Sequence, residues 1–127
     1  MSFGDGLRVS GKTILANMLT ARRQLILGVG GAIIDGTPVK TGALKGSWYT
    51  TLDTPSGDAT PRLDSTGEAP KAELASTQID LTTDVFLTNN LDYAEAIEYG
   101  HSQQAPAGMV RVNTMGIEGI TFNLETN

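Results

Sequence analysis

The stretch that decides the fold is GKTILANMLTARRQLILGVGGAIID, residues 11–35. Because each residue of an α-helix adds about 100°, its apolar side chains fall within an arc of roughly 140°. They are Ile14, Leu15, Met18, Leu19, Leu25, Ile26, Val29, Ala32 and Ile33, interrupted only by Arg22. This periodicity predicts a helix of about 38 Å that buries one face and organises the rest of the chain.

Three glycines, Gly28, Gly30 and Gly31, weaken the second half of this helix by about 1 kcal/mol each relative to alanine. Gly28 and Gly31 lie away from the apolar stripe, where missing side chains would let another backbone approach. Two interpretations stay open: a contact between subunits at these glycines, or a helix break near Gly28. The sequence Gly36-Thr37-Pro38 predicts the end of the helix, because proline disfavours a helical residue before it.

Two strands are predicted downstream of this helix. Residues 47–52 and 84–88 are rich in aromatic and β-branched side chains, which favour strands, and Ile79 and Leu81 could extend the second one. Residues 117–124 also read as a strand. Tryptophan is usually at least partly buried, so core packing is the favoured interpretation of Trp48, with an interface anchor as the alternative.

The segment between the strands holds a loop and a short helix. Residues 53–67, DTPSGDATPRLDSTG, have the composition of a long mobile loop. Thr41 could cap a brief turn before the first strand, and Pro70 suits the first turn of a short helix after the loop. The predicted fold class is α+β, with a long N-terminal amphipathic helix packed on a small, mainly antiparallel sheet and one or two short helices. We expect a single domain over residues 1–127.

The run LTNNLDYAEAIEYGHSQQAPAGM, residues 87–109, joins a strand ending, a short helix and an amide-rich loop. Asn89 and Asn90 have side chains that bond readily to nearby backbone, which ends a strand and opens a turn. In the helix that follows, Tyr93 and Ile97 are one turn apart and are predicted to pack on the sheet.

This short helix, over residues 93–99, carries signals at both of its ends. Asp92 and Glu95 have the spacing of a capping box, and Gly100 suits a left-handed C-cap. Capping and solvation also explain Glu98 together with these two acids, so they are not predicted to perform acid–base chemistry.

The competing motif is Gly6 to Thr13, GLRVSGKT, which matches the phosphate-binding loop pattern GxxxxGK[ST] and would indicate nucleotide binding. That loop needs a buried strand before it, and residues 1–5 are too few and too polar to supply one. The simpler interpretation is that Ser10 or Thr13 caps the long helix. His101 is the only histidine and there is no cysteine, which makes a zinc cluster implausible. No catalytic, cofactor or metal site is predicted.

Charge and hydropathy exclude two other classes. Nine Lys and Arg against fourteen Asp and Glu give a net charge of −5, which opposes tight binding to a phosphate backbone. The apolar run from Leu25 to Ile34 follows two arginines, as in a secretory signal, but three glycines interrupt it. It is also too short for a bilayer, which needs about 20 residues. Neither export nor membrane insertion is predicted.

Two blocks of the chain, about a quarter of its length, resemble the neck or tail-completion protein family of tailed bacteriophages. The matching elements are Thr37-Pro38-Val39, Thr41-Gly42-Ala43-Leu44 and Ser47-Trp48, and then Asn89-Asn90, Tyr93-Ala94, Glu98-Tyr99-Gly100 and Gln104 to Met109. The chain departs from the family's usual residues at Lys40, Ala43 and Asp92, where the family has an acidic residue, a basic residue and proline.

The resemblance implies a structural virion protein without enzymatic activity, a subunit of the connector between phage head and tail. Copies would form a closed ring, expected to be hexameric, assembled in the host cytoplasm. The ring would contact neighbouring connector and tail-terminator or tail-tube proteins, with DNA passing through its lumen without specific binding. A small monomeric adaptor is the alternative.

A ring requires one patch of a subunit to dock on a different patch of the next copy. The first candidate surface is the long helix with Gly28 and Gly31. The second is the loop 101–109 with the short helix before it. Its candidate contacts are Tyr99, Met109, His101, Gln103, Gln104 and Pro106. For Gly100, Pro106 and Gly108, turn geometry alone is the alternative.

Overall fold

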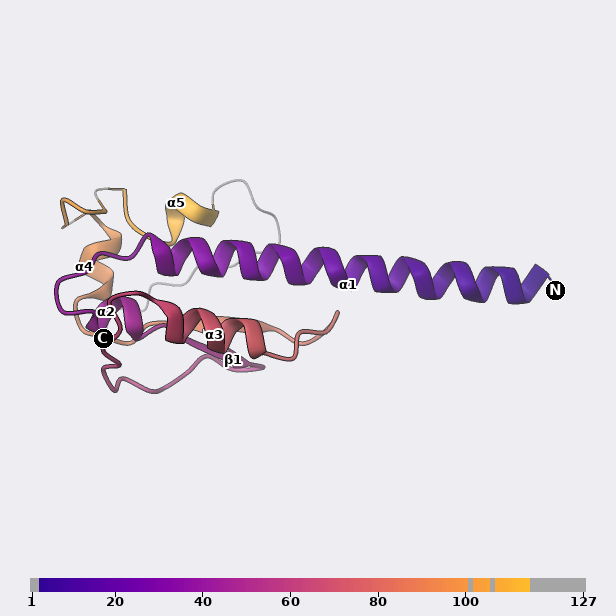
Figure 1. Cartoon of the computed structure of the whole chain (residues 1–127), viewed down its shortest axis with the longest axis horizontal. Coiled ribbons are helices and arrows are strands. Elements are labelled where there is room, and N and C mark those ends of the chain that lie inside the picture. Colours follow the sequence, from indigo (N-terminus) through magenta and orange to yellow (C-terminus); the bar gives the residue numbers. More distant parts are fainter. Residues whose placement is uncertain (1–2, 101, 106, 115–127) are drawn as a thin grey trace.

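The computed structural model describes residues 3–100, 102–105 and 107–114, with side chains from Gly11 onward. Its largest element is α1 (Phe3–Asp35), a helix of 33 residues and therefore roughly 50 Å long. The N-terminal half of α1 projects well beyond the other described elements (Figure 1). The predicted helix over residues 11–35 is confirmed, and it continues without interruption through Gly28, so the break considered there is wrong.

Thr37 terminates α1 and connects it to the core. Its hydroxyl donates to the carbonyl of Ile33 at 2.7 Å and accepts from the indole Nε1 of Trp48 at 2.9 Å. Pro38, which follows, has no backbone N–H to continue the helix. The predicted end of the helix at Gly36-Thr37-Pro38 is therefore confirmed, and the threonine side chain gives it a tertiary partner.

Six shorter elements follow α1 among the described residues. They are α2 (Ala43–Gly46), β1 (Tyr49–Leu52), α3 (Glu68–Ser76), β2 (Val85–Thr88), α4 (Ala94–Glu98) and α5 (Arg111–Thr114). The two strands pair antiparallel, with Tyr49 opposite Thr88 and Leu52 opposite Val85. This is the predicted α+β class. Ile79 and Leu81 do not extend β2, and the strand predicted over 117–124 lies outside the described residues.

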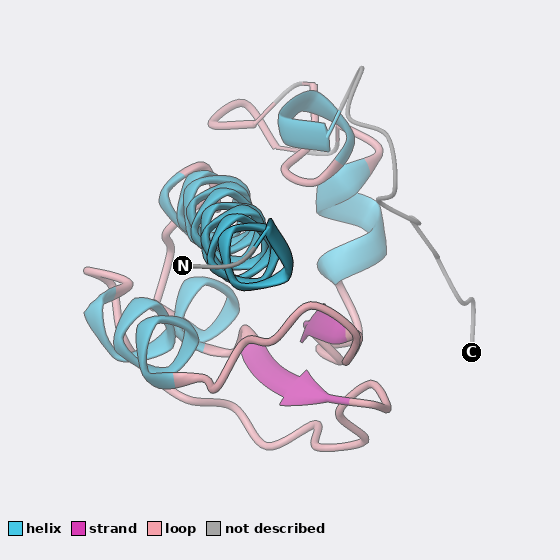
Figure 2. Cartoon of the chain, turned by 90° about the vertical axis from the view of Figure 1, so that its right-hand side faces the viewer, coloured by secondary structure: helices cyan, strands magenta, loops and turns pink. Residues whose placement is uncertain are grey.

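Viewed along its axis, α1 lies between α3 on one side and α4 with α5 on the other, above the small sheet (Figure 2). α3 approaches α1 closely at Gly30, where an added Cβ would press against the side chain of Leu74. At Gly28 and Gly31 an added Cβ would meet nothing within 4 Å. Of the three glycines in the second half of α1 that the sequence singled out, Gly30 is therefore the one used for packing within the chain.

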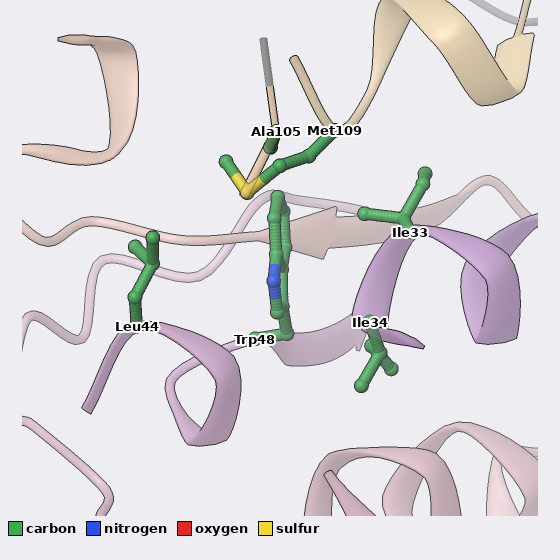
Figure 3. Close-up of a cluster of buried hydrophobic side chains, with 6 residues drawn as sticks. All are labelled: Ile33, Ile34, Leu44, Trp48, Ala105 and Met109. Atoms are coloured by element: carbon green, nitrogen blue, oxygen red, sulfur yellow. The ribbon is translucent and has the colours of Figure 1, made fainter. Parts of the chain in front are cut away.

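One buried cluster joins the end of α1 to three later segments. It contains Ile33, Ile34, Leu44, Trp48, Ala105 and Met109. Figure 3 shows the thioether of Met109 beside the indole of Trp48, and both side chains are at most 5% exposed. Sulfur–aromatic contacts of this kind are favourable. The core therefore depends on contacts between residues about 60 positions apart in the sequence.

The loop over residues 53–67 is irregular, as predicted, but it is attached to the body rather than free. Arg62 donates to the carbonyls of Gly46 and Trp48, both at 2.6 Å, and pairs with Glu73 at 2.9 Å. Its guanidinium also lies 4.4 Å from the centre of the Tyr49 ring. Arg62 therefore attaches the middle of the segment to the body, while the mobility expected of this loop stays a prediction.

Candidate functional site

Two segments of the chain, within residues 37–48 and 89–109, lie against each other in the structure. The amide of Asn89 donates to the carbonyl of Leu44 at 2.8 Å. Gln104 binds the backbone of Val39 twice, accepting from its N–H at 3.0 Å and donating to its carbonyl at 3.2 Å. Each block thus satisfies backbone groups of the other, which fixes their relative position.

A hollow of about 290 Å³ lies where these blocks meet. We call it the signature groove. Its apolar lining comes from Val39, Leu44, Tyr93 and Ile97, with Lys40 and Gln104 among the polar residues that complete it. Tyr93 is 46% exposed, so the prediction that it packs on the sheet is wrong, whereas Ile97 does pack against the core.

Glu98 is the buried ionisable group that the sequence did not reveal. Its side chain was expected to be solvated, but the residue is 1% exposed. Its carboxylate accepts from the backbone N–H groups of Met109 and Val110, both at 2.7 Å. It also accepts from the N–H of Arg111 at 2.9 Å and from the Nε of that residue at 3.0 Å. Glu98 therefore clamps the chain that leads into α5 onto α4.

The environment of Glu98 favours its ionised form. Burial alone would raise the pKa of its carboxyl group, but the hydrogen bonds from Val110, Arg111 and Met109 outweigh burial and leave the pKa below its ordinary value. Gly108 lets the two segments approach closely, because it has φ +86° and an added Cβ would collide with the carbonyl oxygen of Glu98. The contact between Glu98 and residues 109–111, which we call the clamp, therefore contains an ionised carboxylate at neutral pH.

A second surface lies on the projecting half of α1. Arg22 donates to the carbonyls of Asp80 and Thr83, and Arg23 donates to those of Ala75 and Thr77. The residues before this pair extend away from the body (Figure 1). The sequence periodicity predicted one buried face along the whole helix, and this is wrong for its first half.

Four apolar residues on this face, three before Arg22 and one after Arg23, are instead open to solvent. We call this surface the helix stripe. Its members and their exposed fractions are Ile14 at 58%, Leu15 at 53%, Met18 at 52% and Leu25 at 44%. They span about 100° of the helix circumference, on the face that continues into Val29 and Ile33. The same apolar face is therefore buried at one end of α1 and uncovered at the other.

Several residues proposed as interface contacts have roles inside the subunit. Trp48 is a core residue, which confirms the favoured interpretation of core packing over an interface anchor. Met109 lies in the same cluster, so its assignment as an interface anchor is wrong for the single chain. The side-chain amide of Gln104 is hydrogen-bonded to the backbone of Val39. Tyr99 remains 51% exposed, with the guanidinium of Arg111 4.7 Å from its ring centre.

Three of the remaining interface candidates lie among the described residues. Gln103 is exposed, and Gly28 and Gly31 face open space. His101 and Pro106 lie outside the described residues. Gly100 has φ +88°, which confirms the left-handed C-cap predicted after the short helix.

The structure bears on two local motifs read from the sequence. Residues 6–13 form part of α1, in agreement with the rejection of a phosphate-binding loop, but Ser10 and Thr13 lie inside the helix, so the prediction that one of them caps it is wrong. The capping box is also absent, because Tyr93 occupies the N-cap position of α4 and makes no side-chain capping bond. Asn89 does make the predicted local bond, accepting from the N–H of Leu91 at 3.2 Å.

Within residues 3–100, 102–105 and 107–114, no group of three His, Cys, Asp or Glu side chains is placed to hold a metal ion. In the same part of the chain, no helix combines the length and apolar character needed to cross a bilayer. No protein family, curated protein or solved structure matches the chain.

Proposed function

We propose that the chain is a structural virion protein of a tailed phage, a ring-forming subunit of the head–tail connector that completes the tail and joins it to the head. The observation that carries this proposal is the helix stripe on the projecting half of α1. Burying a large apolar side chain stabilises by about 1.5–3 kcal/mol relative to leaving it exposed. An uncovered row of such side chains is therefore a surface for association.

The packing of the two sequence blocks gives the proposal its second support. Thr37, Leu44 and Trp48 from the first block join Asn89 and Met109 from the second around one core. The resemblance to tail-completion proteins therefore covers residues that hold this fold together. In our proposal the signature fixes the fold, and the exposed surfaces supply the contacts between subunits.

The finer parts of the proposal concern the assembled particle. The ring is hexameric, it meets neighbouring connector and tail-terminator or tail-tube proteins, and DNA passes through its lumen without specific binding. The net charge of −5 suits this passage, because an acidic wall repels the phosphate backbone. Assembly takes place in the host cytoplasm, and the mature protein resides in the virion.

The test combines particle size with location. Light scattering and electron micrographs of the purified chain, alone and mixed with lysate from phage-infected cells lacking it, are expected to show closed rings. Purified virions should contain the chain, and phage lacking its gene should accumulate unjoined heads and tails. A chain that stays monomeric in both mixtures and is absent from virions would instead be a small adaptor.

A further inference from the structure

The helix stripe and the signature groove lie at opposite ends of the molecule. In Figure 1 the projecting half of α1 forms one end of the long axis, and α2 and α4, which flank the groove, form the other. Both surfaces are apolar and partly open. Two unlike surfaces at opposite ends are what a repeating head-to-tail contact requires.

Charge differs between α1 and the chain that follows it. Residues 3–35 carry four basic and two acidic residues, whereas residues 36–114 carry ten acidic and five basic residues. Two copies of α1 packed together would bring like charges into contact. Docking of α1 on the body of another copy would bring Lys12, three residues from Leu15, toward the acidic surface around Asp92 and Glu95 on either side of Tyr93.

The dimensions of the groove indicate the kind of occupant. Small-molecule pockets usually enclose about 300–1,000 Å³, and the signature groove of about 290 Å³ falls at the lower limit. Five of its nine lining residues are apolar or aromatic (Pro38, Val39, Leu44, Tyr93 and Ile97), and the other four are Lys40, Thr41, Ser102 and Gln104. It therefore suits one or two apolar side chains presented by a helix better than a free ligand.

We propose that the helix stripe of one copy docks in the signature groove of the next copy. The inference rests on the proposed function, and it names the two surfaces that make the ring contact. Leu15 and Met18 of one subunit pack against Val39, Tyr93 and Ile97 of its neighbour. Repetition of this contact uses one stripe and one groove from every subunit.

The test uses one variant for each surface. The stripe variant is Leu15→Glu with Met18→Glu, and its control is Asn17→Glu with Gln24→Glu, which adds the same charge at exposed positions on another face of α1. The groove variant is Tyr93→Lys, and its control is Leu63→Lys, at a side chain 72% exposed elsewhere on the body. Circular dichroism and thermal melting check that every variant is folded.

Both surface variants are expected to sediment as monomers, and both controls are expected to assemble like the parent chain. The decisive sample is an equal mixture of the two surface variants. Each retains the surface that the other lacks, so the mixture should form a one-to-one dimer that cannot grow further. This outcome is specific to a contact between unlike surfaces.

Because the chain has no cysteine, a cross-linking measurement can detect weak contacts. Copies with Met18→Cys mixed with copies with Tyr93→Cys should give more cross-linked dimer with a short bismaleimide than either alone. If Tyr93→Lys assembles normally while the stripe variant does not, or if Met18→Cys copies link best to each other, the docking inference is overturned although ring formation stands. If the parent chain neither assembles nor cross-links and is absent from virions, the proposed function itself fails.

Discussion

The carboxylate of Glu98 and the guanidinium of Arg111 form an ion pair with 3.0 Å between Oε1 and Nε, and its two members differ sharply in exposure. The glutamate side chain is 2% exposed and the arginine side chain is 44% exposed. Arg111 also donates from Nη2 to the backbone carbonyl of Glu98 at 2.8 Å. The buried acid is thus satisfied mainly by backbone N–H groups, with the arginine covering it from the solvent side.

Replacing Glu98 with glutamine should therefore destabilise the fold rather than alter only the surface. Glutamine keeps one acceptor oxygen but loses the charge that binds three backbone N–H groups and Arg111. We expect the free energy of unfolding, measured by urea denaturation, to fall by about 2–4 kcal/mol. Glu95→Gln on the same helix is the control and should change it by less than about 0.5 kcal/mol. Equal effects of the two substitutions would contradict the clamp.

The clamp also predicts the direction of acid destabilisation. The pKa of Glu98 in the folded chain lies below its ordinary value of 4.5. A carboxyl group of this kind stabilises the fold above its unfolded pKa, and this contribution is lost as the pH falls toward its folded pKa. The difference in unfolding free energy between the parent chain and Glu98→Gln should accordingly shrink between about pH 5 and pH 3.

Hydrogen bonds from Thr66 and Thr83 lower the pKa values of Asp64 and Asp80 to about 2. Protonation of these two carboxylates at acid pH destabilises the parent chain and the Glu98→Gln variant equally. They therefore cancel in the comparison between the parent chain and Glu98→Gln. A difference that stays constant from neutral to acid pH would show that the charge of Glu98 contributes nothing.

Single substitutions can distinguish the contributions of Met109 and Tyr99 to the stability of the fold. Met109 is 1% exposed beside Trp48, so Met109→Ala should lower the free energy of unfolding by about 2–5 kcal/mol through lost contacts and a cavity. Tyr99 is 51% exposed, so Tyr99→Ala should cost less than about 1 kcal/mol. Thermal denaturation followed by near-ultraviolet circular dichroism of Trp48 measures both. A larger loss from Tyr99→Ala than from Met109→Ala would reverse this assignment.

The parts of the fold that the sequence predicted are those determined by neighbouring residues. The spacing from Ile14 to Ile33 predicts α1, Thr37-Pro38 predicts its end, and Gly100 predicts a left-handed cap. Contacts between distant residues were missed. Glu98 follows two solvent-facing acids at helical spacing, and nothing local indicates that its partners are at residues 109–111.

The helix stripe shows a second limit of prediction from sequence. Apolar periodicity predicts that a face will be covered, but it does not say whether the cover comes from the same chain. Val29 and Ile33 are covered by the subunit itself, whereas Ile14 and Met18 on the same face are not. The loop over residues 53–67 illustrates a related limit, because its composition predicts an irregular segment but not the long-range bonds that Arg62 makes from it.

Arg62 should also limit the access of proteases to this loop. Arg62→Ala removes the bonds to Gly46 and Trp48 and the ion pair with Glu73, so residues 53–67 should become a substrate for limited proteolysis by proteinase K. Arg62→Lys is the informative control, because an ammonium group cannot reproduce the separate Nε, Nη1 and Nη2 contacts of the guanidinium. Both variants should be cut within the loop faster than the parent chain, with the alanine variant fastest, while mass spectrometry locates the cleavage. Equal cleavage of all three would mean that the other contacts of the loop, including those from Asn90 to the carbonyls of Ser56 and Asp58, hold it without Arg62.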